Sequence, residues 1–335
     1  MPPGAKTREG YRAMEKTIGR KLIAERAGVS MRTVTRVLQG DKLVAEQTRL
    51  RVLEVVDELG YTRNKIAGNL SRNKNSNFVV VLVPDMSNYY YLEIFDYLTK
   101  FFEKYDYIVS ICRINENNLF KTFDTMLENR VSVIINLGFF PINEEYLKKI
   151  NSAKIKIIHP GVGTDPVPIN IDYSAAMEEA FCSFLGRGLK KFKFVCGGGK
   201  NFLEDGRIRC FCNCSINTGW KNEQYYLGDY PASNAMETGE TAVKNLSDGR
   251  ARRDFLLTDA MAFGGMQFHK DGKRSGRYFV IGFDNTLMSK FCVPPLSTID
   301  SSTEIEIQRY ITYILDKNLN NDTIVSKFIK RASSV

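Results

Sequence analysis

Residues 22–38 carry the sequence LIAERAGVSMRTVTRVL, which has the pattern of two short helices joined by a tight turn. Gly28 can adopt the positive φ that ends a helix, and Ser30 can cap the next helix through its side-chain oxygen. Apolar residues recur at helical spacing on both sides of this turn: Ile23, Ala24, Ala27, Val34, Val37 and Leu38. The stretch therefore predicts two amphipathic helices that bury one stripe each.

The exposed face of the second predicted helix carries the functional signal. Arg32 and Arg36 are four residues apart and so share one face, and Met31 and Thr35 lie beside it. The start of this helix would then be free to enter the major groove of DNA, as in a helix-turn-helix protein. The pattern alone leaves open a plain pair of packed helices with solvated arginines.

The distribution of charge favours a nucleic-acid partner. Residues 1–77 contain 16 Lys and Arg against 8 Asp and Glu, so they hold +8 of the chain's net charge of +9. Positive charge concentrated on one small segment is expected of a domain that binds phosphates, because displaced counterions then contribute to affinity. We therefore predict double-stranded DNA as a partner.

Composition excludes several classes of protein. The 335 residues are enough for two or three domains, and 43% hydrophobic with 25% charged residues is typical of a soluble globular protein. No apolar run approaches the roughly 20 residues that cross a bilayer, and no signal-peptide core is seen, so we expect a cytoplasmic protein with no membrane partner. Seven cysteines in mostly apolar stretches favour reduced thiols over a disulfide framework.

The predicted domain organisation has four parts. Residues 1–16 are expected to be a disordered basic leader, or an arm that touches phosphates, and Met1 and Met14 are both candidate starts. Residues 17–62 form the helix-turn-helix head, whose third helix, Thr48–Leu59, ends at Gly60. Residues 63–77 form a linker in which a short hinge helix would be marginal alone and could fold on meeting DNA.

The fourth part, residues 78–335, alternates short apolar runs with amphipathic helical stretches. The predicted strands are Phe78–Val83, Tyr107–Arg113, Val131–Leu137, Ile155–His159, Phe192–Cys196, Phe255–Thr258 and Tyr278–Phe283. The predicted helices are Leu92–Lys104, Leu119–Asn129, Ala175–Arg187, Ala235–Leu246 and Met261–His269. This alternation implies parallel sheets, and the length favours two similar lobes with ligands at the carboxyl ends of the strands.

Taken together, the motifs resemble the lactose, purine and galactose repressor family from about Lys21 to the C-terminus. In the head they are Ala27-Gly28-Val29-Ser30, Thr33-Val34, Arg36-Val37-Leu38, Thr48-Arg49 and Glu58-Leu59-Gly60-Tyr61. Further along they are residues 84–91, Asn170-Ile171-Asp172, residues 207–211, residues 258–262, Gly282-Phe283-Asp284-Asn285 and residues 294–298. The resemblance implies a small all-α three-helix head and an α/β two-lobed effector domain like the periplasmic sugar-binding proteins, with parallel sheets.

What the resemblance implies for DNA is a homodimer, or a tetramer, whose heads occupy adjacent major grooves of a near-palindromic operator. The residues implied to contact DNA are Met31, Arg32 and Arg36 at base edges, Ser30, Thr33 and Thr48 at phosphates, and Leu70 as a wedge in the minor groove. Two departures weaken the expected hinge, since Arg63 and Gly68 stand where the family has proline and a longer side chain. Ala45 replaces the serine that usually caps the third helix and cannot cap it.

For the effector, the resemblance implies a small-molecule site, most simply for a sugar or sugar phosphate. Its implied residues are Asn88, Tyr90, Tyr91, Asn201, Arg207, Tyr230, Thr258 and Asp284. Aromatic faces stack on sugar rings, and Arg, Asn and Asp bond hydroxyls in pairs. Asp284 could instead cap the next helix, and the spacing around Tyr230 differs from the family's by a residue or two.

From the sequence we expect no cofactor, no metal ion and no catalytic residues, and therefore a protein that is not an enzyme. The chain contains only two histidines, His159 and His269. A zinc site with histidine ligands or a Ser-His-Asp triad therefore has few candidate residues. The run Cys210, Cys212 and Cys214 is interpreted as ordinary packing, because Cys212 would point away from the other two on a helix. The predicted function is a repressor of a carbohydrate-use operon. The alternatives are a family member controlled by a protein co-effector and a cytoplasmic sugar-binding protein without operator specificity.

Overall fold

The computed structural model describes residues 19–62, 75–138, 140–159, 167, 169–185, 193–196, 205–217, 225–227, 234–245, 252–256, 258–270 and 278–334. The chain divides into two compact units between Lys74 and Asn75, and each unit is described by itself. The predicted site residues Leu70, Asn201 and Tyr230 lie outside the described residues, as do most of the predicted hinge and the predicted leader.

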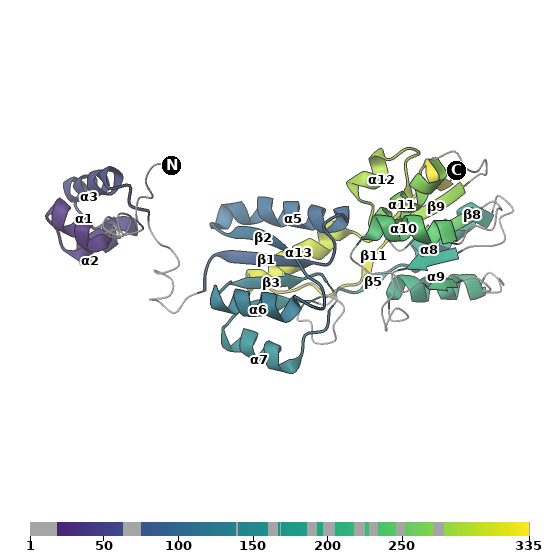
Figure 1. The fold of residues 1–335 in the computed structure, drawn as a ribbon, viewed down its shortest axis with the longest axis horizontal. Helices are drawn as coiled ribbons and strands as arrows, with labels where there is room; N and C mark the ends of the chain where they lie inside the picture. Colours follow the sequence, from purple (N-terminus) through teal and green to yellow (C-terminus); the bar gives the residue numbers. More distant parts are fainter. Residues whose placement is uncertain are drawn as a thin grey trace, which may run out of the picture. The chain divides into compact units, whose positions relative to one another are not determined.

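In the first unit, the described residues 19–62 form three helices packed around a small core (Figure 1). They are α1 (Arg20–Ala27), α2 (Met31–Leu38) and α3 (Glu46–Glu58). Ile23, Val34 and Val52, one from each helix, are completely buried and hold the three together. Gly28 adopts φ +63° and ends α1, as the sequence predicts. The N-cap of α3 is Ala45, which makes no side-chain cap bond, so the expected loss of this cap is also observed.

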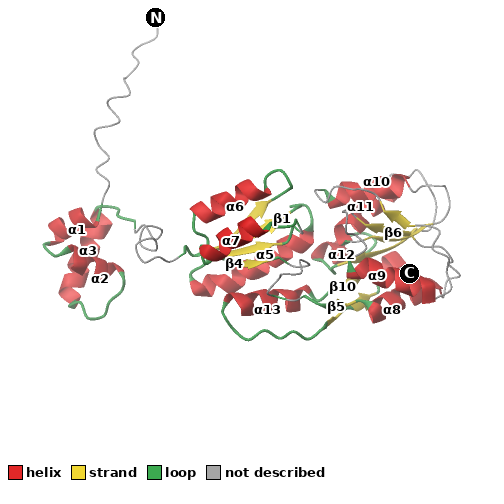
Figure 2. Cartoon of the chain, turned by 90° about the horizontal axis from the view of Figure 1, so that it is seen from below, coloured by secondary structure: helices red, strands yellow, loops and turns green. Residues whose placement is uncertain are grey.

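The first lobe of the second unit is a four-stranded parallel sheet in the order β2-β1-β3-β4. Its strands are β1 (Phe78–Val83), β2 (Ile108–Arg113), β3 (Val133–Asn136) and β4 (Lys156–Ile158). Its helices are α5 (Tyr89–Phe102), the 3-10 turn η1 (Glu103–Tyr105), α6 (Leu119–Glu128) and α7 (Glu144–Ser152). Helices α5 and α13 cover one face of this sheet, and α6 and α7 the other (Figure 2).

The alternation along β1 explains this sandwich. Val79, Val81 and Val83 pack into the cluster on the α5 side, whereas Val80 and Leu82 pack into the cluster on the α6 and α7 side. Both faces of the strand are therefore apolar, as expected of a parallel sheet covered by helices on both sides.

The second lobe contains a six-stranded sheet in the order β12-β10-β9-β8-β6-β7, in which only β12 is antiparallel to its neighbour. Its strands are β6 (Lys193–Cys196), β7 (Tyr225–Leu227), β8 (Arg252–Leu256), β9 (Tyr278–Phe283), β10 (Ser297–Asp300) and β12 (Lys327–Ile329). Its helices are α8 (Ser174–Leu185), α9 (Gly206–Asn217), α10 (Ala235–Asn245), α11 (Asp259–Lys270), α12 (Leu287–Phe291) and the 3-10 turn η3 (Ala332–Ser334).

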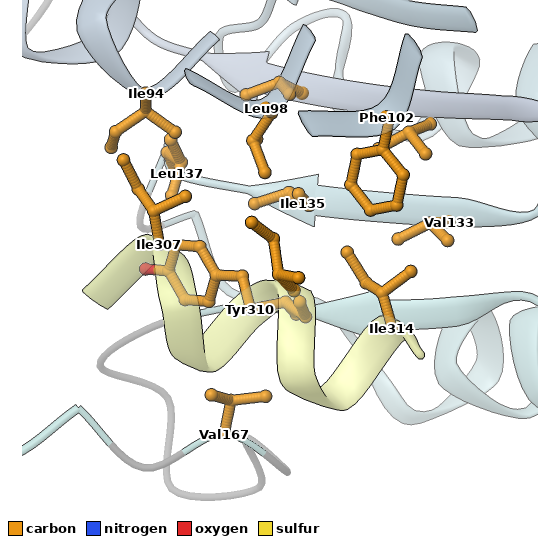
Figure 3. Close-up of a cluster of buried hydrophobic side chains, with 14 of the residues drawn as sticks. Ile94, Leu98, Phe102, Val133, Ile135, Leu137, Val167, Ile307, Tyr310 and Ile314 are labelled. Carbon is orange, nitrogen blue, oxygen red and sulfur yellow. The ribbon is translucent and has the colours of Figure 1, made fainter. Parts of the chain in front are cut away.

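Helix α13 (Thr303–Ile314) returns the chain to the first lobe. Figure 3 shows Ile307, Tyr310 and Ile314 of α13 on the opposite side of a shared core from Ile94, Leu98 and Phe102 of α5. The short strands β5 (Ile171–Asp172) and β11 (Ile324–Val325) pair in parallel where the chain runs between the lobes. The two lobes are therefore joined by three passages of the chain.

Glycines let α10 and α11 approach each other very closely. A Cβ atom at Gly239 would lie 1.9 Å from the carbonyl oxygen of Met261, and one at Gly264 would lie 1.9 Å from the carbonyl oxygen of Met236. The two contacts are reciprocal, so the backbones of the two helices touch at their crossing. This packing holds the two helices in register beside the sheet of the second lobe.

The predicted fold class is confirmed, although several elements were missed. The pattern did not predict α7, α9, α12 and α13, or the short strands β5, β7, β10, β11 and β12. In α13 the sequence Thr-Glu-Ile-Glu-Ile alternates polar and apolar residues as a strand does, and in α9 the run Cys-Phe-Cys-Asn-Cys alternates similarly. Within the part of the chain that the structure describes, no helix is both long and apolar enough to span a membrane.

Candidate functional site

The start of α2 is built by the side chain of Ser30. Its hydroxyl oxygen accepts a hydrogen bond from the backbone N–H of Thr33 at 3.0 Å and lies 2.9 Å from the Thr33 hydroxyl. This is the cap that the sequence predicts. Both hydroxyl groups therefore sit at the positive end of the helix, where a phosphate would be stabilised by the helix dipole.

Met31 and Arg32 occupy the first turn of α2 and project from the unit. Both are exposed, and 56% of the Met31 side chain is accessible to solvent although the residue is apolar. An exposed methionine at the start of a helix otherwise built on a buried valine stripe suits contact with a partner surface. Thr35 is half-buried, and its hydroxyl donates to the carbonyl oxygen of Met31 in the same helix at 2.9 Å.

The guanidinium of Arg36 is held by a residue that the sequence did not single out. Its Nε donates to Oδ2 of Asp41 at 2.7 Å, and the other oxygen of Asp41 accepts from the backbone N–H of Leu43 at 2.9 Å. The hydrogen bond from Arg36 is the main cause that lowers the pKa of Asp41. Thr48, the sixth DNA-contact residue predicted within the described head, lies half-buried in the first turn of α3.

In the second unit, Arg207 is the centre of the predicted effector site. It lies in the first turn of α9, and its Nη2 and Nε donate to the two carboxylate oxygens of Asp205 at 2.7 Å and 3.0 Å. Its Nη1 lies 4.0 Å from Oδ1 of Asp284, which follows β9, and the guanidinium stands 5.8 Å over the ring of Phe283. The structure thus places Arg207 beside Asp284, two of the residues named for the effector site.

Tyr91 joins this group from the first lobe. It is buried in the first turn of α5, and its ring meets that of Tyr90 edge-on at 5.2 Å. Burial raises the pKa of Tyr91, and the nearby carboxyl group of Asp284 raises it further, whereas Arg207 lowers it. Tyr91, Arg207 and Asp284 therefore lie within electrostatic range of one another across the two lobes.

Tyr90 points elsewhere within the same region. Its hydroxyl donates to Oε2 of Glu306 at 2.9 Å, and Tyr310 donates to the other carboxyl oxygen of Glu306. Burial is the largest cause that raises the pKa of Tyr90, followed by the charge of Glu306. The prediction placed Tyr90 as a wall of the effector site, and the structure gives its hydroxyl a partner on α13.

Two other predicted residues serve as helix caps. The side-chain oxygen of Asn88 accepts from the backbone N–H of Tyr90 at 3.1 Å, which begins α5 three residues earlier than predicted. The hydroxyl of Thr258 accepts from the backbone N–H of Met261 at 3.2 Å at the start of α11. Asp284 is not a cap of this kind, since its backbone φ is +97° and its carboxyl group lies near Arg207.

Sequence reasoning missed three residues around this group. Tyr173 is edge-on to Phe283 at 6.2 Å, and burial raises its pKa against the opposing charge of Arg207. Asp205 pairs with Arg207, and its position two residues earlier in a loop gave no periodic signal. Glu306 lay in a segment whose helix was not predicted. The strand-like alternation of that segment concealed it.

Two carboxylates of the first lobe bond to backbone groups of the second. Oδ2 of Asp85 accepts from the N–H of Ala235 at 2.8 Å, in the first turn of α10, while its other oxygen accepts from Ser87. Glu93 of α5 accepts from the N–H of Leu287 at the start of α12. Each negative side chain therefore meets the positive end of a helix of the opposite lobe.

The chemistry of this group suits a hydroxyl-bearing ligand. Asp284 is buried, and this burial raises its pKa well above its ordinary range despite the charge of Arg207. A guanidinium beside buried carboxyl groups and aromatic rings offers paired donors, acceptors and ring faces. Among the described residues no group of three His, Cys, Asp or Glu side chains could hold a metal ion.

Comparison with known proteins agrees with this architecture. The family model described as "Bacterial regulatory proteins, lacI family" matches residues 21–64. Catabolite control protein A of Priestia megaterium is 28% identical over 320 residues, which cover 92% of this chain and 94% of the relative. The similarity thus extends through both units.

Solved structures share the fold at lower identity. The lac repressor dimer bound to operator and the anti-inducer ONPF superposes with a TM-score of 0.71 at 20% identity, covering 96% of this chain and 100% of the other. The transcriptional regulator CelR in complex with cellobiose superposes with a TM-score of 0.60 at 17% identity, covering 94% and 99%. These similar proteins are a catabolite control protein, a repressor and a transcriptional regulator. Residues 21–64 thus match the lacI family of bacterial regulatory proteins, and the whole chain is similar to catabolite control protein A and shares the fold of the lac repressor.

Proposed function

We propose that this protein is a DNA-binding transcriptional repressor of a carbohydrate-use operon, released or recruited by an uncharged sugar held between its two lobes. The observation that carries the proposal is the convergence of Tyr91 from the first lobe with Arg207 and Asp284 from the second. A ligand that bonds to these three residues would contact both lobes at once. Its binding would therefore bias the angle between them.

The head supports sequence-specific recognition of operator DNA. The exposed Met31 and Arg32 occupy the turn of α2 that enters a major groove in helix-turn-helix proteins, and the Ser30 and Thr33 hydroxyls lie where a phosphate would bind. Arginine can donate two hydrogen bonds to guanine O6 and N7. We assign Met31, Arg32 and Arg36 to base edges and Ser30, Thr33 and Thr48 to phosphates.

Charge favours a neutral sugar over a sugar phosphate. Three carboxyl groups influence Tyr91, those of Asp284, Asp85 and Glu306, whereas Arg207 is the cation that acts on it. Two of the N–H donors of Arg207 are already bonded to Asp205. Among these groups the carboxyl groups outnumber the guanidinium group, which disfavours a phosphate dianion beside Tyr91. Hydroxyl groups, in contrast, can donate to carboxyl oxygens and accept from the guanidinium.

Cellobiose is bound by one structural neighbour, and the lac repressor dimer is bound to operator, so a dimeric, operator-binding and sugar-responsive protein fits the family. We infer that this chain acts as a homodimer in the cytoplasm, where operator DNA is accessible. No cofactor is needed for such a function.

The test combines two titrations of the full chain. Isothermal titration calorimetry with uncharged mono- and disaccharides and their phosphate esters gives the ligand class. Fluorescence anisotropy with duplex DNA from upstream of the protein's own gene, with and without each sugar, gives the coupling. We expect an uncharged sugar to bind and to change operator affinity by about 5- to 150-fold. Equal or tighter binding of the phosphate ester would contradict the proposed ligand class, and no preference among duplexes at near-physiological salt would contradict the proposed function.

A further inference from the structure

The turn after β9 holds two residues in a backbone conformation that side chains rarely adopt. Asp284 has φ +97° and Asn285 has φ +51°, and neither is glycine. Backbone strain of this kind persists only where the surrounding structure holds it, and it is concentrated at functional sites. Other segments of the chain must therefore hold this turn.

The strain brings Asp284 to the same side of the sheet as its neighbour Phe283. Successive side chains of a strand point to opposite faces. Phe283, the last residue of β9, packs on the α8 and α9 side, where the guanidinium of Arg207 stands over its ring. A continued strand would turn Asp284 toward α10 and α11, yet its carboxyl group lies 4.0 Å from the same guanidinium. The left-handed φ of Asp284 thus lets two consecutive residues meet Arg207.

The backbone of the turn is bonded at each residue. The N–H groups of residues 284–286 donate in order to the carbonyl oxygen of Ile299 at 2.9 Å, the hydroxyl oxygen of Thr298 at 3.1 Å and Oδ2 of Asp259 at 2.8 Å. These N–H groups exchange with solvent only when the turn opens. Their exchange rates therefore report how firmly the turn is held.

The side chain of Arg331 holds the turn from a distant part of the sequence. Its Nη2 donates to Oδ1 of Asn285 at 2.5 Å, and its Nη1 donates to the carbonyl oxygen of Leu296 at 2.7 Å and to the Ser289 hydroxyl at 3.0 Å. One guanidinium thus ties the turn to α12 and to the residue before β10. Arginine suits this role because its planar fork presents several donors in a fixed geometry.

Separate bonds place the segment 331–334 against β9 and β10. The N–H of Arg331 donates to the hydroxyl oxygen of Ser297 at 2.8 Å, and this hydroxyl donates to the carbonyl oxygen of Arg331 at 2.9 Å. The hydroxyl of Ser333 accepts from the N–H of Ser297 at 2.8 Å and donates to the carbonyl oxygen of Val280 at 2.6 Å. The segment is therefore anchored by its backbone and by Ser333, which leaves the Arg331 side chain to bond to the turn.

We propose that Arg331 is a positioning residue of the effector site, which holds the turn at residues 284–286 so that the carboxyl group of Asp284 faces Arg207. The hold passes from Arg331 to the side chain of Asn285 and from there to Asp284 through the backbone that they share. The consequence for the effector rests on the proposed function, whereas the hold on the turn does not. The experiments therefore measure the turn and the effector separately.

The first experiment is amide hydrogen exchange of the native full chain without any sugar. Arg331→Gln removes the guanidinium fork, and we expect the amides of residues 284–286 to exchange at least about tenfold faster, because a hydrogen bond from a charged group no longer opposes opening. Lys330→Gln is the matched control, since it makes the same change of charge at the exposed neighbouring position. It should leave these amides as in the parent. Unchanged exchange in Arg331→Gln would overturn the proposal.

A second variant separates positioning from a general loosening of the segment. Ser333→Ala removes the bonds to Ser297 and Val280 but keeps the bond from Arg331 to Asn285. Both this variant and Arg331→Gln should lower the urea concentration at the midpoint of unfolding. Only Arg331→Gln should speed the exchange of residues 284–286 by more than the loss of global stability accounts for. The same local acceleration in Ser333→Ala would overturn the positioning role.

A double-mutant cycle tests the path through Asn285. Asn285→Gly removes the amide group that Arg331 holds, and glycine adopts the positive φ without a steric cost. In this background Arg331→Gln should change the exchange of residues 284–286 by less than about twofold, because its bond to the turn is already absent. An effect as large as that in the parent would overturn the path through Asn285.

The effector is tested by calorimetry with D-glucose, D-galactose, lactose and maltose. For each of these sugars that binds the parent, we expect severalfold weaker binding to Arg331→Gln and parent-like binding to Lys330→Gln, because apparent affinity falls with the fraction of molecules that keep the turn in place. Unweakened binding to Arg331→Gln would overturn its role in the effector site. Failure of all four sugars to bind the parent would count against the proposed ligand class, and the exchange rates would still decide whether Arg331 holds the turn.

Discussion

Asp41 fixes the guanidinium of Arg36, with Oδ2 accepting from Nε at 2.7 Å across the end of α2. The bond occupies the Nε donor of the guanidinium and ties the end of the side chain to the turn after α2. A fork held in this way is pre-organised to meet two acceptors on one base, so less side-chain entropy is lost on binding. Asp41 is thus a positioning residue for the residue that we assign to base reading.

The first prediction follows from this pair. Asp41→Ala should weaken binding to the operator, because Arg36 loses its orientation, while it strengthens binding to unrelated DNA, because a negative charge near phosphates is removed. Anisotropy titrations with both duplexes over a range of salt measure the two affinities. The matched variant Glu46→Ala also removes a carboxylate from the head, from an ion pair with Arg49, and should raise both affinities together. The same parallel rise in Asp41→Ala would show that Asp41 acts only through its charge.

The second prediction concerns Arg207. Arg207→Lys keeps the positive charge but loses the two parallel hydrogen bonds to Asp205 and the planar group over Phe283. We expect effector affinity to fall by about tenfold or more, since hydrogen bonds to charged groups contribute about 1.5 to 3 kcal/mol. Calorimetry measures the change, and affinity for operator without effector should stay as in the parent. Lys100→Arg, on the exposed face of α5, is the control and should change neither.

The third prediction concerns the bonds between the lobes. Asp85→Ala removes the acceptor for the N–H of Ala235, and we expect the unliganded second unit to open, because a buried hydrogen bond to a carboxylate is lost. Small-angle X-ray scattering should show a larger radius of gyration, and adding Glu93→Ala should increase it further. Ser87→Ala removes one bond of Asp85 within the first lobe and keeps the bond to Ala235, so it should leave the radius unchanged.

The fourth prediction concerns the crossing of α10 and α11. Gly239→Ala and Gly264→Ala each place a methyl group on a backbone carbonyl 1.9 Å away, so the helices must separate. Overpacking costs about 1 to 3 kcal/mol and sometimes more, and a backbone atom cannot yield as a side chain does. Urea unfolding should show a loss at the upper end of that range. Thr241→Ala, at an exposed position of α10, should fall within about 0.5 kcal/mol of the parent.

The fifth prediction concerns Asp259, which is completely buried at the start of α11. Burial raises its pKa to about 7, although Thr286 donates two hydrogen bonds to it. The pKa of this carboxyl group is higher in the folded state than in the unfolded state. Its contribution to the free energy of unfolding is therefore largest at acid pH, where the group is protonated in both states. Its contribution is lost as the pH rises toward 7 and is constant above that value.

The variant Asp259→Asn isolates this effect. The parent should lose stability relative to the variant by up to about 1.4 kcal/mol for each pH unit between pH 5 and 7. Urea unfolding of both proteins at several pH values measures the difference. A difference that stays constant across this range would mean that Asp259 has an ordinary pKa.

Much of the fold could be predicted from periodicity, and the missing parts have a physical cause. The buried valines of β1 and the glycine after α1 act locally, so the sequence around them reports their structure. Glu306 and Tyr310, in contrast, sit in a helix only because α13 packs on α5 and β3, a contact between segments some 200 residues apart along the chain. Propensity carries no information on such a partner.

The candidate sites show the same difference between residues fixed by local sequence and residues fixed by contacts with distant segments. Ser30 was predicted as a cap from its neighbours, and the structure agrees. Arg207 and Asp284 were named as effector-site residues only through the family resemblance, and no local pattern predicts that β9 ends beside α9. Asp41 escaped notice because its role depends on a turn of the chain after α2, which periodicity does not describe.

The return of α13 to the first lobe has a consequence for synthesis. Ile307, Tyr310 and Ile314 complete the core under β1 and β3, yet they are synthesised more than 200 residues after β1. The lobe that begins first is therefore completed only after strands β6 to β10 of the other lobe have been made. A nascent chain stalled before Thr303 would leave the apolar side chains of α5 and β3 that α13 covers exposed to solvent. Such a truncated product would be a target for chaperones and proteases.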